Sequence, residues 1–89
     1  MSVVLLPSSL RQYVHQQARV EIQGDTISAV LQNLMSMAPE MRNHLFAAKE
    51  LRNFVVVSVN GSDIRRLQGL ATGVSPSDEV RILSSIAGG

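Results

Sequence analysis

The amino-acid sequence predicts a single α+β domain: a roll in which a mixed sheet of four to five strands carries one main helix on one face. Two segments, 18–23 and 79–83, alternate apolar and polar residues as half-buried strands do. Between them, apolar residues recur at the three- and four-residue spacing of one helix face over 27–34. A chain of 89 residues has room for one small core, so we expect one domain and no deep substrate cavity.

The first two strands are predicted to pair as a hairpin. The β-branched and apolar run 3–6 is closed by the turn residues Pro7-Ser8-Ser9. The return strand is the alternating segment 18–23, in which Val20 and Ile22 face inward.

The main helix is predicted to begin directly after Gly24-Asp25-Thr26, where Asp25 or Thr26 can accept a hydrogen bond from the free amides of the first turn. Pro39 marks its end. Its buried stripe comprises Ile27, Val30, Leu31 and Leu34, with Met35 and Met37 as expected gap fillers. A short second helix is predicted from Met41 to Ala48, with Leu45 and Phe46 as candidates for burial.

The second half of the chain is predicted to complete the sheet. The β-branched run 54–59 leads into the turn pair Asn60-Gly61, and a short arm containing Ile64 follows. An irregular crossover through 69–73 then reaches the last strand, 79–83. In this order the first and last strands can pair in parallel at the centre of the sheet.

Composition excludes several classes of function. The net charge of +1 offers no broad electrostatic surface for nucleic acid, and the absence of cysteine excludes a disulfide framework and a thiolate nucleophile. His15 and His44 fit no metal-ligand spacing, so we expect surface histidines and no metal site. The run before Pro7 is too short for a signal-peptide core or a membrane span, which predicts a cytoplasmic protein with no membrane partner.

The strongest functional feature is the segment Ala87-Gly88-Gly89, which closely follows the last predicted strand. Glycine lacks Cβ, so such a segment can pass through a channel too narrow for side chains. We therefore predict a domain over 1–85 and a flexible tail over 86–89 whose Gly89 carboxylate enters a partner's active site. Adenylation by ATP there would convert the carboxylate to an acyl-adenylate that a sulfur nucleophile can attack.

Several blocks of the sequence resemble the MoaD/ThiS family of sulfur carriers, and within it the CysO-type branch of cysteine biosynthesis. The resemblance is nearly full length. Its blocks are Leu6-Pro7-Ser8-Ser9-Leu10-Arg11, Gly24-Asp25-Thr26, Phe54-Val55 through Val59-Asn60, Asp63-Ile64-Arg65, Gly69-Leu70-Ala71-Thr72, Asp78-Glu79-Val80-Arg81-Ile82-Leu83 and Ile86-Ala87-Gly88-Gly89.

The resemblance implies a β-grasp, ubiquitin-like fold and a role as a protein-borne sulfur donor that is not itself an enzyme. It implies no bound cofactor, because an E1-like adenylyltransferase/sulfurtransferase partner uses ATP and a sulfur source to form a thiocarboxylate at Gly89. The CysO-type branch further implies a PLP-dependent cysteine synthase and a metallopeptidase as partners.

A partner-binding surface is predicted beside the tail. Alternation in the last strand places Leu83 on the face away from the helix, where Val56 of the preceding long strand can adjoin it. Ubiquitin-like proteins use this face for docking to activating enzymes, and an interface needs a central apolar anchor. The predicted partner contacts are therefore Leu83, Val56, Ile86, Ala87 and Gly88, with Gly89 as the reacting residue.

Three alternatives remain open at this stage. The protein can be a ubiquitin-like modifier conjugated through Gly89 to lysines of other proteins. It can be the small subunit of molybdopterin synthase, or an interaction domain in which the terminal glycines are incidental. The sulfur acceptor is also open.

Overall fold

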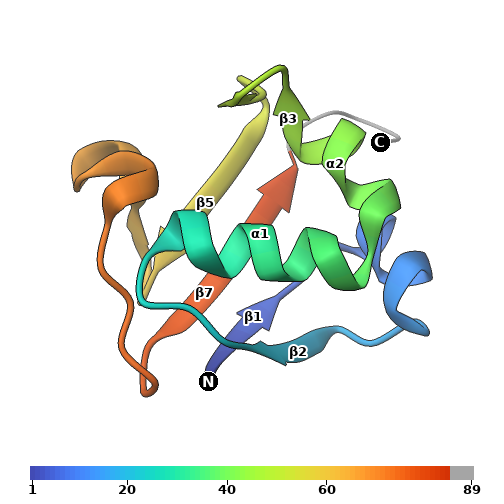
Figure 1. The fold of residues 1–89 in the computed structure, drawn as a ribbon, viewed down its shortest axis with the longest axis horizontal. Helices are drawn as coiled ribbons and strands as arrows, with labels where there is room; N and C mark the ends of the chain where they lie inside the picture. Colours follow the sequence, from blue (N-terminus) through green and yellow to red (C-terminus); the bar gives the residue numbers. More distant parts are fainter. Residues whose placement is uncertain (85–89) are drawn as a thin grey trace.

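The computed structural model describes residues 1–84, and its centre is a five-stranded mixed sheet of order β2-β1-β7-β5-β6 (Figure 1). The central pair, β1 and β7, is parallel, whereas β1–β2, β5–β7 and β5–β6 are antiparallel. This confirms the predicted pairing of the first and last strands. The strands span Ser2–Leu5 (β1), Arg19–Ile22 (β2), Val55–Val59 (β5), Ser62–Asp63 (β6) and Glu79–Ser84 (β7).

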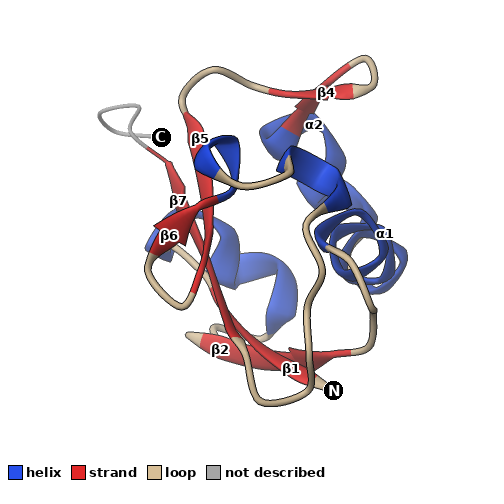
Figure 2. Cartoon of the chain, turned by 90° about the vertical axis from the view of Figure 1, so that its left-hand side faces the viewer, coloured by secondary structure: helices blue, strands red, loops and turns tan. Residues whose placement is uncertain are grey.

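One main helix, α1 (Ile27–Met37), crosses one face of this sheet (Figures 1 and 2). It begins at Thr26, whose side-chain oxygen accepts from the Ala29 amide at 3.2 Å, so the structure selects Thr26 over Asp25 as the cap. The predicted apolar stripe is fully buried. It packs on the inward residues of the sheet, which are Val4, Val20, Ile22, Val55, Val57, Val59, Val80 and Ile82.

The connection between β1 and β2 is longer and more structured than the predicted turn. It contains the 3₁₀ helix η1 (Ser8–Val14), whose Leu10 and Val14 belong to the core. Both residues are buried, at 2% and 4% exposure, so this connection packs against the core.

The end of α1 and the segment after it correct two predictions. The helical part comprises η2 (Pro39–Met41) and α2 (Arg42–Leu45) and ends at Leu45, well before Ala48. A two-stranded hairpin of β3 (Phe46–Ala47) and β4 (Glu50–Leu51) follows, turning through Ala48 at φ 58°. Met37, expected to fill a gap in the core, is 54% exposed at the last residue of α1.

The second half of the chain follows the predicted course with one change. Asn60-Gly61 forms the β5–β6 turn with φ values of 51° and 89°, as expected for a primed hairpin turn. Ile64 is buried but begins η3 (Ile64–Arg66) instead of continuing β6. The crossover continues through η4 (Gly69–Ala71) to β7.

Candidate functional site

β7 determines where the predicted tail leaves the domain. It is flanked on both sides, by β1 and by β5, and Ser84 at its end pairs with Val55. A strand in the interior of a sheet is fixed by two ladders of backbone hydrogen bonds. Residues 85–89 therefore follow a point that is fixed relative to the core. The predicted site residues Ile86, Ala87, Gly88 and Gly89 lie outside the described residues.

The other end of β7 is fixed by a polar cluster. The Ser75 backbone amide and the Asn60 side-chain amide donate to the Asp78 carboxylate at 2.8 and 2.9 Å. These hydrogen bonds lower the pKa of Asp78 below its ordinary value of 3.8, and the bond from Ser75 has the larger effect. Asn60 also accepts from the Glu79 amide at 2.9 Å. The first residue of β7 is thus tied to the β5–β6 turn.

The sheet face that α1 leaves uncovered carries the predicted docking pair. Val56 and Leu83 are direct partners in the β5–β7 ladder. Leu83 is 46% exposed and Val56 is partly exposed, whereas their chain neighbours Val55, Val57 and Ile82 are buried. The structure therefore brings the two predicted residues together on the open face, directly beside the end of β7.

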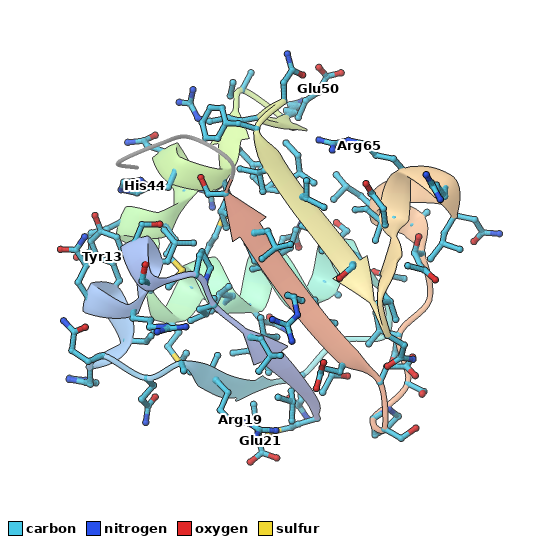
Figure 3. All side chains as sticks on the ribbon, turned by 180° about the vertical axis from the view of Figure 1, so that it is seen from behind. Tyr13, Arg19, Glu21, His44, Glu50 and Arg65 are labelled. Carbon is cyan, nitrogen blue, oxygen red and sulfur yellow. The ribbon has the colours of Figure 1, made fainter. Side chains whose placement is uncertain are left out.

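The charged residues Glu79 and Arg81 precede Leu83 on the same strand. Arg81 lies between Leu5 of β1 and Ser58 of β5, and its guanidinium is 3.8 Å from the Glu79 carboxylate. Both side chains of this ion pair are half exposed, so it contributes little to stability. Figure 3 views the molecule from behind, with Arg19 and Glu21 on β2 at the far edge of the sheet. The open face thus carries an apolar pair near the end of β7, with charged residues toward the start of β7 and on β2.

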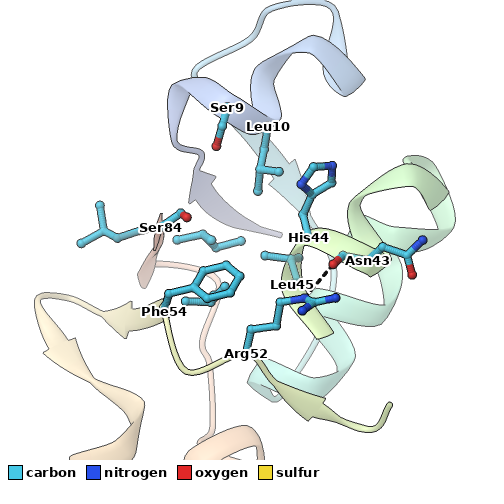
Figure 4. Close-up of a pocket in the computed structure, with 11 residues that line it drawn as sticks. Ser9, Leu10, Asn43, His44, Leu45, Arg52, Phe54 and Ser84 are labelled. Carbon is cyan, nitrogen blue, oxygen red and sulfur yellow. Dashed lines mark hydrogen bonds between the residues drawn. The ribbon is translucent and has the colours of Figure 1, made fainter. Parts of the chain in front are cut away.

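A pocket that the sequence did not predict lies at the end of the sheet where β7 finishes. Its volume is about 140 Å³. It is lined by Ser9, Leu10, Asn43, His44, Leu45, Arg52, Phe54, Val55, Ile82, Leu83 and Ser84 (Figure 4). These residues come from four separate segments, so local sequence patterns gave no signal of it.

Polar side chains at the rim of this pocket are held by specific contacts. The Tyr13 hydroxyl and His44 Nε2 form a hydrogen bond of 2.9 Å. Arg52 Nε donates to the Asn43 carbonyl at 2.8 Å (Figure 4), and its guanidinium carbon lies 5.9 Å from the centre of the Phe54 ring. His44 is exposed, as predicted, but it is also part of this rim.

Residues 1–84 contain no group of three or more histidine, cysteine or acidic side chains placed to hold a metal ion. Within the same residues, no helix has the length and apolar character needed to cross a bilayer.

The fold defines a small ubiquitin-like protein of the β-grasp class. The chain belongs to the ThiS family, whose model matches residues 4–89 and so includes the two terminal glycines. This confirms the family that the sequence blocks indicate.

The curated relatives are named as sulfur carrier proteins. The chain is 35% identical over 89 residues to the sulfur carrier protein CysO of Mycobacterium tuberculosis, covering 97% of this chain and 96% of the relative. It is 30% identical over 87 residues, with the same coverage of both chains, to a putative sulfur carrier protein of Archaeoglobus fulgidus.

Solved structures show the same fold over almost the whole chain. The Amycolatopsis orientalis BexX/CysO complex contains a chain that superposes with a TM-score of 0.92 at 29% identity, covering 100% of both chains. Mycobacterium tuberculosis CysO superposes with a TM-score of 0.89 at 31% identity, covering 97% of this chain and 100% of the other. Small archaeal modifier protein 1 of Methanosarcina acetivorans gives 0.87 at 27% identity, covering 99% and 95%.

Proposed function

We propose that this protein carries sulfur as a thiocarboxylate on Gly89 and donates it within partner enzymes, acting as their co-substrate and not as a catalyst. The observation that carries the proposal is the family match through Gly88-Gly89, a pair placed shortly after a strand in the interior of the sheet. The sulfur-carrier relatives, similar over 97% of the chain, support the same role.

The chemistry requires two steps in an activating, E1-like adenylyltransferase. A Gly89 carboxylate oxygen attacks the α-phosphorus of ATP, forming an acyl-adenylate and releasing pyrophosphate. Sulfide then adds to the carbonyl carbon, and AMP leaves with its electron pair. One carbon–oxygen bond is replaced by one carbon–sulfur bond with no change in oxidation state, and the ATP belongs to the partner.

The described domain would contribute recognition. Leu83 and Val56 form an apolar pair on the open face beside the end of β7, where a partner could dock while the tail enters its active site. A buried apolar anchor with a polar surround is the usual composition of a specific interface. Ile86, Ala87 and Gly88 would contact the channel that leads to the reacting carbon.

The proposed acceptor belongs to cysteine biosynthesis, as the resemblance to CysO-type carriers implies; the similarity to Mycobacterium tuberculosis CysO in sequence and structure supports it. An aminoacrylate on a PLP-dependent cysteine synthase would be attacked by the thiocarboxylate sulfur at its β-carbon. Transfer of the acyl group from sulfur to the neighbouring amine would leave cysteine amide-linked to Gly89. A metallopeptidase would then hydrolyse that bond.

Purified activating enzymes test the carrier proposal. The protein is incubated with ATP, sulfide and E1-like enzymes encoded in the same genome, and its intact mass is measured. We expect a mass increase equal to the exchange of one oxygen for one sulfur, and no increase for a variant that lacks Gly89. An unchanged mass with every such enzyme would reject the proposal.

A second candidate function is conjugation to other proteins through Gly89, favoured by the similarity to small archaeal modifier protein 1 at a TM-score of 0.87. The same acyl-adenylate would then react with a lysine amine instead of sulfide. Reductant-resistant conjugates of higher mass in the native host, absent when Gly89 is deleted, would identify this function. Their absence, with a thiocarboxylate present, would leave the carrier function alone.

A further inference from the structure

The pocket at the end of the sheet is placed to receive a residue of the tail. Ser84, the last described residue, is itself part of the pocket lining, and Ile82 and Leu83 of the same strand line it too. Residues that follow Ser84 therefore start at the pocket. An extended chain advances about 3.3 to 3.6 Å per residue, so residue 86 can lie anywhere within roughly 7 Å of Ser84.

The pocket has the chemistry of an aliphatic site. Leu10, Leu45, Val55 and Ile82 are buried core residues at its base, and the Phe54 ring packs against the same core (Figure 4). The serine, asparagine, histidine and arginine residues of the lining are all partly or fully exposed to solvent. Its volume of about 140 Å³ suits one small apolar group and is too small for a folded segment.

We propose that this pocket binds the Ile86 side chain when no partner is bound to the protein. Among residues 85–89 only Ile86 has a large apolar side chain, because the others are Ser85, Ala87, Gly88 and Gly89. The polar rim formed by Ser9, His44 and Ser84 is compatible with a backbone that passes over it. A branched aliphatic side chain close to an apolar pocket is favoured to enter it by the hydrophobic effect.

Docking of Ile86 would set the length of the free tail. Only Ala87-Gly88-Gly89 would extend beyond the pocket, with a reach of about 10 Å. Burial of one aliphatic side chain is similar in size to the entropy lost when two residues are ordered. The docked state is therefore reversible, and a partner that binds Ile86 competes with the pocket for it.

NMR spectroscopy of the full chain tests this inference. We expect nuclear Overhauser contacts from the Ile86 methyl groups to the Phe54 ring and to the Leu45 methyls. Ile86→Ser should remove them and shift the Leu10, His44 and Leu45 signals. Ile86→Val should lower the ratio of docked to free tail about fourfold, which corresponds to the loss of one buried methylene. Ser85→Ala, which leaves Ile86 intact, is the matched control.

Two results would overturn the inference. In the first, Ile86 shows no contact with the pocket, and Ile86→Ser shifts the pocket signals no more than Ser85→Ala does. In the second, the contacts appear between differently labelled copies and grow with concentration, which assigns the pocket to a second copy of the chain. Both readouts are independent of sulfur loading. The docking of Ile86 can therefore be rejected while the proposed carrier function holds, and the carrier function can be rejected while the docking holds.

Discussion

Val56 and Leu83 lie directly opposite each other on β5 and β7, on the sheet face that α1 leaves open. Directly opposed residues of an antiparallel pair bring their side chains into contact on one face. Leu83 is also part of the pocket lining at the end of the sheet. One residue therefore connects the open face with the place from which the tail departs.

Leu83→Ser should weaken recognition by the activating enzyme while the fold stays intact. Truncating an interface anchor costs about 1 to 2 kcal/mol, which is roughly a 5- to 30-fold increase in KM. Because Leu83 is 46% exposed, its replacement should lower the free energy of unfolding by less than about 1 kcal/mol. Pyrophosphate exchange kinetics and urea unfolding measure the two effects.

Leu67→Ser is the matched control for that experiment. Leu67 is 47% exposed and lies in the crossover segment between η3 and η4. Its replacement should leave KM unchanged. Equal effects of the two substitutions would mean that exposed apolar area in general, and not this face, governs recognition.

Neighbouring residues of β7 should respond very differently to truncation. Ile82 is 1% exposed and belongs to the core beneath α1. Ile82→Ala should lower the free energy of unfolding by about 2 to 5 kcal/mol, because it removes buried methyl groups and leaves a cavity. Leu83→Ala, one residue further on, should lower it by less than about 1 kcal/mol. Urea denaturation of both variants checks this, and similar losses would show that the two residues do not face opposite sides.

Gly24→Ala should destabilise the start of α1. Gly24 has φ of +154°, and a Cβ there would lie 2.7 Å from both the backbone nitrogen and Cγ2 of Val30. Forcing a group into packed structure costs about 1 to 3 kcal/mol. Gly73→Ala is the control, because its Cβ would meet only the Asp25 carbonyl at 3.9 Å. If thermal unfolding shows that Gly73→Ala destabilises the fold more than Gly24→Ala does, the proposed clash between residue 24 and Val30 is wrong.

The turn before β7 should make stability depend on acid pH. Hydrogen bonds from Ser75 and Asn60 lower the pKa of Asp78 in the folded state. The ionised carboxylate therefore stabilises the fold above the unfolded pKa of about 4, and this contribution is lost as pH falls through the lower folded value. Asp78→Asn should be less stable than the natural protein at neutral pH, with the difference shrinking in acid. If the stability difference between Asp78→Asn and the natural protein stays constant from pH 7 to pH 2, the ionised Asp78 carboxylate does not stabilise the fold as proposed.

Local patterns in the sequence were sufficient to predict most of the sheet and the main helix. Alternation in 79–83 correctly separated buried Val80 and Ile82 from exposed Leu83, and it also placed Val56 beside Leu83. The stripe of α1 was correct because its spacing matches one helix face. These features depend on periodicity, which a single sequence contains.

Features that depend on long-range packing were missed or misplaced. The helix predicted to run to Ala48 ends at Leu45, since Phe46 instead pairs with Leu51 in a hairpin. The pocket joins η1, α2, β5 and β7 and has no local pattern. The predicted docking roles of Leu83 and Val56, and the roles of Ile86, Ala87, Gly88 and Gly89, remain predictions.

The central claim is that Gly89 bears the sulfur. After incubation with ATP, sulfide and the activating enzyme, trypsin cleavage after Arg81 releases the peptide 82–89 for fragmentation by mass spectrometry. We predict that the oxygen-to-sulfur mass difference is found in this peptide and maps to Gly89. An unmodified 82–89 peptide under these conditions, or a mass difference mapped to any other residue, would contradict the claim.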